Sequence, residues 1–208
     1  MVKQERAART RESLVRAAAE VFTEEGFATA SIAGISGRAG VTSGALHFHF
    51  SGKDELASTV EGRAAAALRV IIRTAGEPGR SGNPLTVLVD STYTLMALLA
   101  GDVVVRAGFA LSADVTHRSR VDLRGQWREW TGELIEAAGR RGLLAEGVTP
   151  RDVTPAVVAS LVGLEVLGTA DPDWFAAPTL TRVWSVLLPG ISGKEHGPED
   201  RPDEHETN

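Results

Sequence analysis

Apolar residues recur every three to four positions along most of the chain, which is the period of an amphipathic α-helix. The first such segment predicts a helix over residues 8–25, and Gly26 follows it as a stop signal. Two short helices are predicted next, over residues 31–38 and 42–47. Gly40 lies between them, where a left-handed residue can close the preceding helix. No segment alternates with period two for long, so no strand is predicted.

The helical pattern continues through the rest of the chain. Ser51, with Asp54 three residues on, predicts a weak capping box at the start of a long connecting helix that Gly76 ends. Thr154 and Pro155 predict the N-cap and first residue of a later helix. The helical segments after the first three span residues 55–76, 84–101, 103–112, 120–142, 154–169 and 177–190. The fold class is therefore all-α, with about nine helices.

Composition narrows the class of protein. The 208 residues suffice for one large domain or two smaller ones. Cysteine is absent, which excludes disulfides, thiolate metal sites and cysteine nucleophiles. No apolar run approaches the ~20 residues of a membrane span, and the polar start of the sequence does not fit a signal peptide. We therefore expect a cytoplasmic protein with no membrane partner.

The net charge of −5 is unevenly distributed. Residues 1–16 hold five basic side chains against two acidic ones, whereas residues 193–208 hold six acidic against two basic. The acidic tail is rich in Gly and Pro and has nothing to bury, so we expect it to be disordered. The overall charge is thus a poor guide to what the N-terminal part binds.

The two short helices around Gly40 describe a helix-turn-helix, a motif that places its second helix in the DNA major groove. Its small core would consist of Ile32, Ile35, Ala39, Val41 and Leu46. The exposed tip of the second helix would consist of Thr42, Ser43, Gly44 and Ala45. Small side chains let the backbone approach the duplex, and hydroxyls can bond phosphates or base edges.

Residues 22–56 read FTEEGFATASIAGISGRAGVTSGALHFHFSGKDEL. This array resembles the DNA-binding domain of the tetracycline-repressor (TetR) family. The matching positions are Phe22, Gly26, Phe27, Ile32, Ile35, Ala39, Gly40, Val41, Gly44, Leu46, His49, Phe50 and residues 53–56. The resemblance implies a DNA-binding domain over residues 1–56 and a ligand-binding and dimerisation domain over residues 57–192. Residues 193–208 remain as the tail.

The end of the motif, His-Phe-His-Phe at residues 47–50, departs in part from the family pattern. The resemblance implies that Phe48 and Phe50 pack into the core and that His49 is a packed, hydrogen-bonded histidine. A metal role for His49 lacks further ligands at suitable spacing. His47 stands where the family usually has Tyr. Replacement of the Tyr hydroxyl by an imidazole would weaken a phosphate contact.

Ser43 stands where many members have Lys, which weakens a second phosphate contact. The basic residues of the N-terminal segment, Arg11 among them, would compensate; the alternative is that this segment is only a solvated charged face. The predicted DNA-binding residues are Lys3, Arg6, Arg9, Ser31, Thr42, Ser43, Gly44, Ala45, His47 and Lys53.

Residues 103–112 and the segment WREWTGELIEAAGRRGLL, beginning at residue 127, resemble the γ-butyrolactone autoregulator receptors of the same family. The resemblance implies that Trp127 lines the ligand pocket, with Trp130 one turn along. Tyr93, Met96, Phe109 and Arg106 are candidates to complete the pocket. The alternative for Trp127 is plain core packing, which is favoured for Trp130, Trp174 and Trp184. Arg106, a charge in an apolar run, would pair with a carboxylate, cap a helix end or meet a ligand oxygen.

The last two helical segments are apolar on all sides, which favours a homodimer interface over a central core helix. We expect a ligand-responsive repressor of the quorum-sensing type, released from a palindromic operator by a small molecule such as a γ-butyrolactone autoregulator. The alternatives are a repressor that responds to drugs or antibiotic intermediates, and an all-helical enzyme. No catalytic motif supports the enzyme, and no metal or cofactor is expected.

Overall fold

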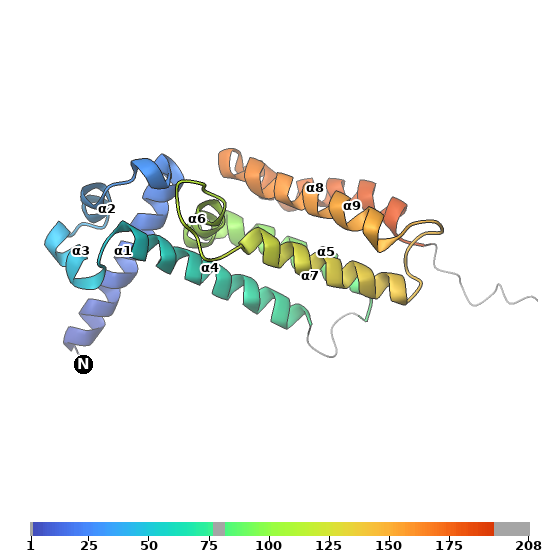
Figure 1. Ribbon diagram of the computed structural model, residues 1–208, viewed down its shortest axis with the longest axis horizontal. Helices are drawn as coiled ribbons and strands as arrows, with labels where there is room; N and C mark the ends of the chain where they lie inside the picture. Colours follow the sequence, from blue (N-terminus) through green and yellow to red (C-terminus); the bar gives the residue numbers. More distant parts are fainter. Residues whose placement is uncertain (1, 77–81, 194–208) are drawn as a thin grey trace, which may run out of the picture.

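The computed structural model describes residues 2–76 and 82–193, so the predicted disordered tail lies outside the described residues from 194 onward. The described part is an elongated, all-helical molecule (Figure 1). Its nine α-helices and one 3₁₀ turn confirm the predicted fold class. They are α1 (Val2–Thr29), α2 (Ile32–Arg38), α3 (Ser43–His49), α4 (Lys53–Ala75), α5 (Pro84–Gly101), α6 (Val103–Ser112), α7 (Leu123–Arg140), α8 (Pro150–Ala170), η1 (Pro172–Phe175) and α9 (Ala177–Ile191).

Local signals in the sequence set the first three helices. α1 begins earlier than predicted and is kinked at Gly26, whose φ of 77° leaves the helical region. The Ser31 hydroxyl accepts a hydrogen bond from the Gly34 amide at 3.0 Å, as an N-cap residue does. Gly40 has a φ of 69°, which lets the chain turn sharply between α2 and α3. The predicted helix-turn-helix is therefore present, although α3 continues to His49.

Two predicted helix starts are wrong in detail. The Ser51 amide and hydroxyl both donate to Glu55 Oε2, at 2.7 and 2.8 Å. The predicted capping box with Asp54 is therefore absent, and Glu55 takes the place of Asp54 as the partner of Ser51. α8 starts at the Thr149–Pro150 pair, with Asp152 completing a capping box, and Pro155 lies inside the helix. The helix begins at the Thr149–Pro150 pair rather than at Thr154–Pro155 because only the first threonine has an acidic residue three positions later.

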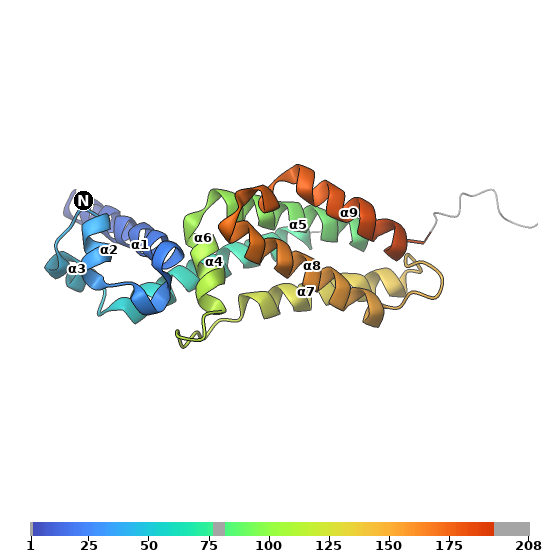
Figure 2. The same cartoon turned by 90° about the horizontal axis from the view of Figure 1, so that it is seen from above.

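The buried apolar residues form two clusters, and α6 contributes to both. Val104, Ala107 and Leu111 pack with α1–α3 and the start of α4, whereas Val105 and Phe109 pack with the long helices of the body. Figure 2 shows α6 standing between these two parts of the molecule. The first cluster extends along α4 beyond residue 56, so the division at residues 56 and 57 stays a proposal.

α4 and α6 pack closely where they cross. A Cβ placed on Gly108 would lie 2.4 Å from the Ala64 Cβ and 3.2 Å from the Val60 carbonyl oxygen. Only glycine permits this approach without displacing one of the two helices. Because α4 also runs from α1–α3 to the body (Figure 1), this crossing joins the two parts of the molecule.

Two helices, α5 and α8, are long and apolar enough to cross a membrane by length and composition alone. The statement that no apolar run approaches this length is therefore wrong. α5 packs against α4, α6, α7, α8, α9 and η1, and α8 packs against α5, α7 and η1. Core positions account for part of their apolar character, and α8 also exposes Val166 and Leu167.

Candidate functional site

The predicted tip of α3 lies at one end of the molecule, away from α8 and α9 (Figure 1). Thr42 caps the helix, since its hydroxyl accepts from the Ala45 amide at 3.1 Å. Ser43 lies 3.2 Å from the Ser36 hydroxyl and so links α3 to α2. Thr42, Ser43 and Gly44 are exposed, and Ala45 is half-buried. The Ser36 hydroxyl donates its proton to the Ile32 carbonyl oxygen, so Ser43 is the donor in its bond with Ser36. The tip thus presents small groups and the Thr42 hydroxyl proton to the outside.

The aromatic residues of α3 point in opposite directions. Phe50 is buried, as predicted, but Phe48 is 82% exposed, so its assignment to the core is wrong. His49 is half-buried and meets the Phe48 ring edge-on at 5.2 Å, without the expected hydrogen bond to the described residues. His47 is exposed beside Phe48. The outward face of α3 therefore combines an imidazole with a large apolar ring.

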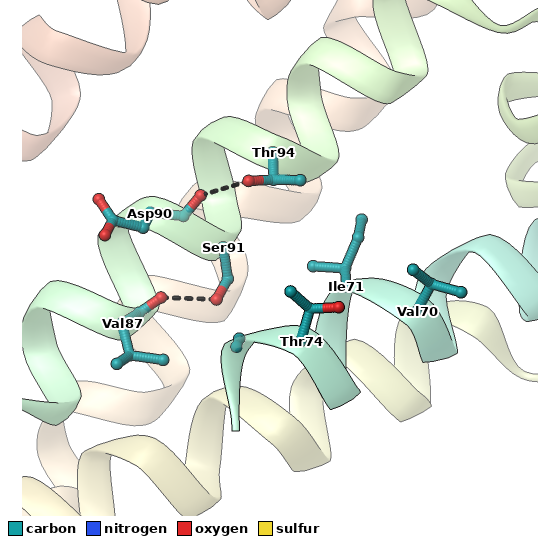
Figure 3. Close-up of a pocket in the computed structure, with 8 residues that line it drawn as sticks. Val70, Ile71, Thr74, Val87, Asp90, Ser91 and Thr94 are labelled. Carbon is teal, nitrogen blue, oxygen red and sulfur yellow. Dashed lines mark hydrogen bonds between the residues drawn. The ribbon is translucent and has the colours of Figure 1, made fainter. Parts of the chain in front are cut away.

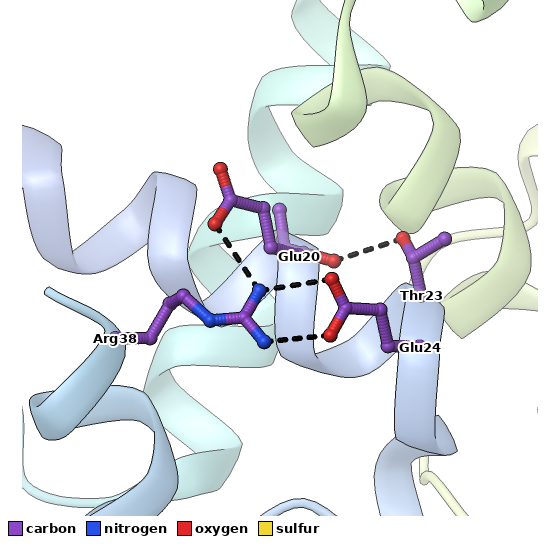
Figure 4. Close-up of polar contacts among 5 residues, drawn as sticks. Glu20, Thr23, Glu24 and Arg38 are labelled. Carbon is purple, nitrogen blue, oxygen red and sulfur yellow. Dashed lines mark hydrogen bonds and ion pairs between the residues drawn. The ribbon is translucent and has the colours of Figure 1, made fainter.

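An ion cluster fixes α2, and through it α3, on α1 (Figure 4). The Arg38 guanidinium donates to both carboxylate oxygens of Glu24, at 2.9 and 2.6 Å, and lies 3.5 Å from Glu20. Hydrogen bonding to Arg38 holds the pKa of the Glu24 carboxyl below its ordinary value. The planar two-point contact fixes angle as well as distance, which suits a support for a reading helix.

The basic N-terminal residues belong to the first turns of α1. Arg6 and Arg9 are exposed there and make no ion pair within the described residues, whereas nothing is described of the Lys3 side chain. Arg11 lies over the Phe50 ring, 4.9 Å from its centroid. The segment therefore offers an exposed basic face next to α3.

Lys53 and Ser31 have structural partners. The Lys53 ammonium donates to the carbonyl oxygens of Phe27, Ala28 and Ala30, at 2.7, 3.3 and 3.0 Å, and lies over the Phe27 ring. Since an ammonium has three protons, this residue has no donor left for a phosphate. We therefore leave Lys53 out of the proposed DNA-binding face, and Ser31 remains as an exposed cap at the start of α2.

A buried polar cluster joins the end of α1, α4 and the loop before α7. His117 Nε2 lies 3.1 Å from Glu61 Oε2, and their side chains are only 3% and 2% exposed. The His117 ring packs on Phe27 at 4.5 Å between centroids. Hydrogen bonds from Thr116, with help from the Phe27 backbone, lower the pKa of Asp114 in the same loop. This loop therefore holds the end of α1 against α4.

Three of the six predicted ligand residues line one cavity in the body. Met96, Phe109 and Trp127 surround it with residues of α8. The cavity is lined by eight residues: Leu95, Met96, Phe109, Arg124, Trp127, Leu161, Val162 and Glu165. About 240 Å³ is empty, but the space open to a water-sized sphere is only about 10 Å³, room for one water molecule at most. The cavity is therefore nearly filled by its own side chains.

The other three predicted ligand residues lie elsewhere. The Tyr93 hydroxyl bonds Thr181 at 2.7 Å and joins α5 to α9. Arg106 donates to the carbonyl oxygens of Leu99 and Ala100, so it caps the end of α5, one of the roles considered for it. Trp130 packs against the body core without lining the cavity. These three side chains therefore do not line this cavity, and a role for them in ligand binding stays a prediction.

The four tryptophans differ in burial. Trp127 and Trp184 are each 3% exposed, and Trp130 is half-buried. Trp174 is 37% exposed, so plain core packing is wrong for it. The indole Nε1 atoms of Trp127, Trp130 and Trp184 are buried without a hydrogen-bond partner in the described part of the chain. For Trp127 this leaves a free donor at the wall of the cavity.

A wider groove lies between α4 and α5 (Figure 3), with about 590 Å³ of space, part of it open to solvent. Val70, Ile71 and Thr74 line one wall, and Asp90, Ser91 and Thr94 are among the residues of the other. The Ser91 and Thr94 hydroxyls donate to carbonyl oxygens of their own helix. No predicted ligand residue lines this groove, and its hydroxyl protons on α5 are already used.

Sequence reasoning missed Phe48 at the DNA-facing end and Arg124 and Glu165 at the cavity. Glu165 interrupts the apolar run LVGLEVLG in the same way that Arg106 interrupts its own run, so the signal was available. The Arg124 guanidinium donates from Nε to Glu165 Oε2 at 2.8 Å. A charge inside an apolar helix predicts a buried partner, and here the partner lies on a different helix.

Comparison with known proteins agrees with this geometry. The family model of bacterial regulatory proteins, tetR family, matches residues 14–60. The chain is 31% identical over 193 residues to the A-factor receptor protein of Streptomyces griseus, covering 92% of this chain and 67% of the relative. These similarities span the DNA-binding end and the body alike.

Two solved structures are similar over nearly the whole chain. A γ-butyrolactone receptor described as ArpA-like superposes with a TM-score of 0.76 and 26% identity, covering 91% of this chain and 90% of that one. CprB of Streptomyces coelicolor, solved with its operator sequence, superposes with a TM-score of 0.75 and 28% identity over 91% of both chains. The chain therefore belongs to the TetR family of bacterial regulatory proteins, in the subgroup of the γ-butyrolactone receptors.

Proposed function

We propose that the protein is a cytoplasmic, homodimeric repressor that binds a palindromic operator and leaves it when a γ-butyrolactone-type molecule enters the body. The observation that carries this proposal is the position of α6. One face of α6 packs with the DNA-binding end, and Phe109, on another face, lines the cavity beside Trp127. A guest in the cavity thus acts on an element that supports α1–α3.

The DNA contacts divide into two sets. Phosphate contacts would come from the exposed basic residues Arg6 and Arg9, with Lys3 as a further candidate, and from the hydroxyl of Thr42. The Ser43 hydroxyl proton bonds Ser36, so Ser43 would contribute through its small size. Base contacts would come from the outward face of α3, where His47 can bond a base edge or phosphate and Phe48 can meet a thymine methyl group. Gly44 and Ala45 add no bulk that would hold α3 away from the groove.

The cavity favours a mainly apolar guest with few oxygens. Leucine, methionine, phenylalanine and tryptophan side chains form most of its wall, and the indole N–H of Trp127 has no partner. An alkyl chain would fill the apolar part, and a carbonyl oxygen would accept from the indole. The small open space means that the guest must displace wall side chains, which couples binding to movement.

α8 and α9 are proposed as the dimer interface. They lie on the same side of the body in Figure 1, and both expose large apolar side chains. Val166 and Leu167 on α8 are 48% and 46% exposed, and Val186 on α9 is 77% exposed. Isolated apolar side chains are common on surfaces, but three on these two helices indicate a covered face. A twofold dimer would place two copies of α3 about 34 Å apart, one DNA turn.

Release follows from a shift between two arrangements. In the first, α4 and α6 hold both copies of α3 at the groove spacing. In the second, an enlarged cavity moves α6, and α4 moves with it because the two are interlocked at Gly108. To change operator occupancy from nearly full to nearly empty, the guest must favour the second arrangement by about 5 kcal/mol.

The test is a mobility-shift titration of the DNA upstream of the protein's own gene, with and without a γ-butyrolactone bearing an alkyl chain. Wild-type protein should shift the DNA, and the lactone should reverse the shift. Trp127→Ala should keep the shift and lose the response, whereas Trp174→Ala, remote from the cavity, should keep both. Failure to shift that DNA or any selected palindrome would refute the repressor role, and an unaltered shift at saturating lactone would refute the ligand class.

A further inference from the structure

The cavity beside Trp127 is bordered by an ion pair. Of its eight lining residues, only Arg124 and Glu165 carry charge. Arg124 lies at the start of α7 and Glu165 on α8, and the 2.8 Å contact between them joins the two helices at the cavity wall. The Glu165 side chain is 7% exposed and that of Arg124 is 32% exposed. The carboxylate is therefore sequestered, and the guanidinium extends from it toward solvent.

This pair leaves hydrogen-bonding groups available. Arg124 uses only Nε toward Glu165, and its two terminal nitrogens bond nothing else in the described chain. The Trp127 indole N–H at the same cavity is buried and also lacks a partner. A buried donor without an acceptor is costly, and this applies to the Trp127 indole; the terminal nitrogens of the partly exposed Arg124 add donors for a guest that supplies acceptor oxygens.

The charges of the pair cancel. A neutral ester or lactone can accept hydrogen bonds from Arg124 and Trp127 without disturbing that balance. A carboxylate guest would compete with Glu165 for the same guanidinium and would bring one uncompensated negative charge into an apolar cavity. Burying an unpaired charge costs far more than burying a paired one.

We infer that the Arg124–Glu165 pair makes the receptor selective for the closed, uncharged lactone and against the hydroxy acid that ring opening produces. The inference rests on the proposed function, because it specifies the chemical state of the ligand at that same cavity. Glu165 is the specificity-determining residue, because its carboxylate pairs with the Arg124 guanidinium that a carboxylate ligand would otherwise bind. Hydrolysis of the lactone ring would then end the signal without any change in the protein.

The test measures the dissociation constants of γ-decalactone and its ring-opened hydroxy acid by calorimetry, in a cycle of four proteins. Wild type should bind the lactone at least about tenfold more tightly than the acid. Glu165→Gln gives the site a net positive charge and should reduce this preference by about tenfold or more. Arg124→Gln gives it a net negative charge and should increase the preference. The double variant, neutral again, should return close to the wild-type ratio.

The opposite signs separate selectivity from a structural role, because loss of the α7–α8 link alone would move both single variants in the same direction. If the lactone-to-acid preference shifted in the same direction in both single variants, or did not shift, the inference would be overturned and the proposed function would remain intact. If no protein binds γ-decalactone although wild type still shifts its operator, the ligand class of the proposed function fails together with the inference. Should Glu165→Gln not fold, Arg124→Gln and the double variant still give different predictions: an increased preference for the lactone in the first and the wild-type preference in the second.

Discussion

The DNA-binding end and the ligand cavity differ in how complete they are. The tip of α3 is exposed, capped by Thr42 and supported by the Arg38–Glu24 contact, so its shape exists before any partner arrives. The cavity is bounded by four helices and nearly filled by its own side chains. The first site can bind without rearrangement, whereas the second must open. The two sites therefore carry different costs of binding.

This difference accounts for a switch that needs no direct contact between the two sites. In the proposed mechanism, a preformed reading helix binds DNA without rearrangement, and a nearly filled cavity makes a guest favour a changed body. α6, which contributes to the apolar clusters of both regions, would transmit the change. The buried Glu61–His117 pair and the Phe27 ring add a second connection from the loop before α7.

The largest expected effect is a loss of stability in the DNA-binding end alone, which would show whether the two regions unfold separately. Leu46 is the buried side chain of α3, and Leu46→Ala should cost about 2–5 kcal/mol in free energy of unfolding. All four tryptophans lie in the body, so their fluorescence follows the body, whereas circular dichroism follows every helix. Denaturation of Leu46→Ala should show helix loss before the fluorescence change. Leu99→Ala, equally buried in the body, is the matched control and should move the fluorescence transition. Coincident transitions in both variants would mean that the regions unfold as one unit.

The next effect tests the α4–α6 crossing. Gly108→Ala places a methyl group against Ala64 and should cost about 1–3 kcal/mol through overpacking. It should also weaken operator binding without any ligand, because it forces α4 away from α6. Gly62→Ala, on the open side of α4, should be neutral or stabilising by up to about 1 kcal/mol. Unfolding curves and mobility shifts of both variants give the comparison, which fails if Gly108→Ala binds DNA like wild type.

A smaller effect concerns the exposed ring on α3. Phe48→Ala should leave the free energy of unfolding nearly unchanged, since the side chain is 82% exposed. Operator affinity should fall by about tenfold, equivalent to about 1.4 kcal/mol, through loss of apolar contact with the duplex. Val115→Ala removes an even more exposed side chain, in the loop before α7, and should alter neither property. Unchanged affinity in Phe48→Ala would remove the ring from the interface.

The smallest effect concerns the loop that holds the end of α1. The Thr116 hydroxyl donates to Asp114 and lowers its pKa below the ordinary 3.8. An acid with a lowered folded pKa adds stability above its ordinary pKa, and this contribution is lost as pH falls through the lower value. Thr116→Val should bring the pKa of Asp114 closer to 3.8 and make stability less sensitive to pH below that point. Titration by NMR checks the pKa; an unaltered value would mean that backbone contacts set it.

Local patterns in the sequence allowed the helix order, the Ser31 cap and the Gly40 turn to be predicted, because each depends on neighbours within four residues. The exposure of Phe48 could also have been derived. Leu46 and Phe50 are four residues apart and share the buried face, so a residue between them, two positions from each, points outward. Here the family pattern was applied where helical geometry gave the better answer.

The cavity wall was only half predictable for a different reason. Met96 and Phe109 lie in apolar helices whose inward side chains are many, and which of them meet Trp127 depends on how helices distant in sequence pack. Tyr93 and Arg106 stand in the same helices but have partners at α9 and at the end of α5. Amphipathic period identifies a buried face, but it does not identify the neighbour across from it.

The tight filling around Trp127 has a consequence for timing. If this cavity takes the ligand, a guest larger than its free space requires the wall side chains to move, so raising the guest concentration would speed capture until the opening rate became the limit. Beyond that point further signal changes how many operators are cleared but not how soon each one is. The packing of a few side chains thereby sets a minimum delay between the arrival of the signal and the start of transcription.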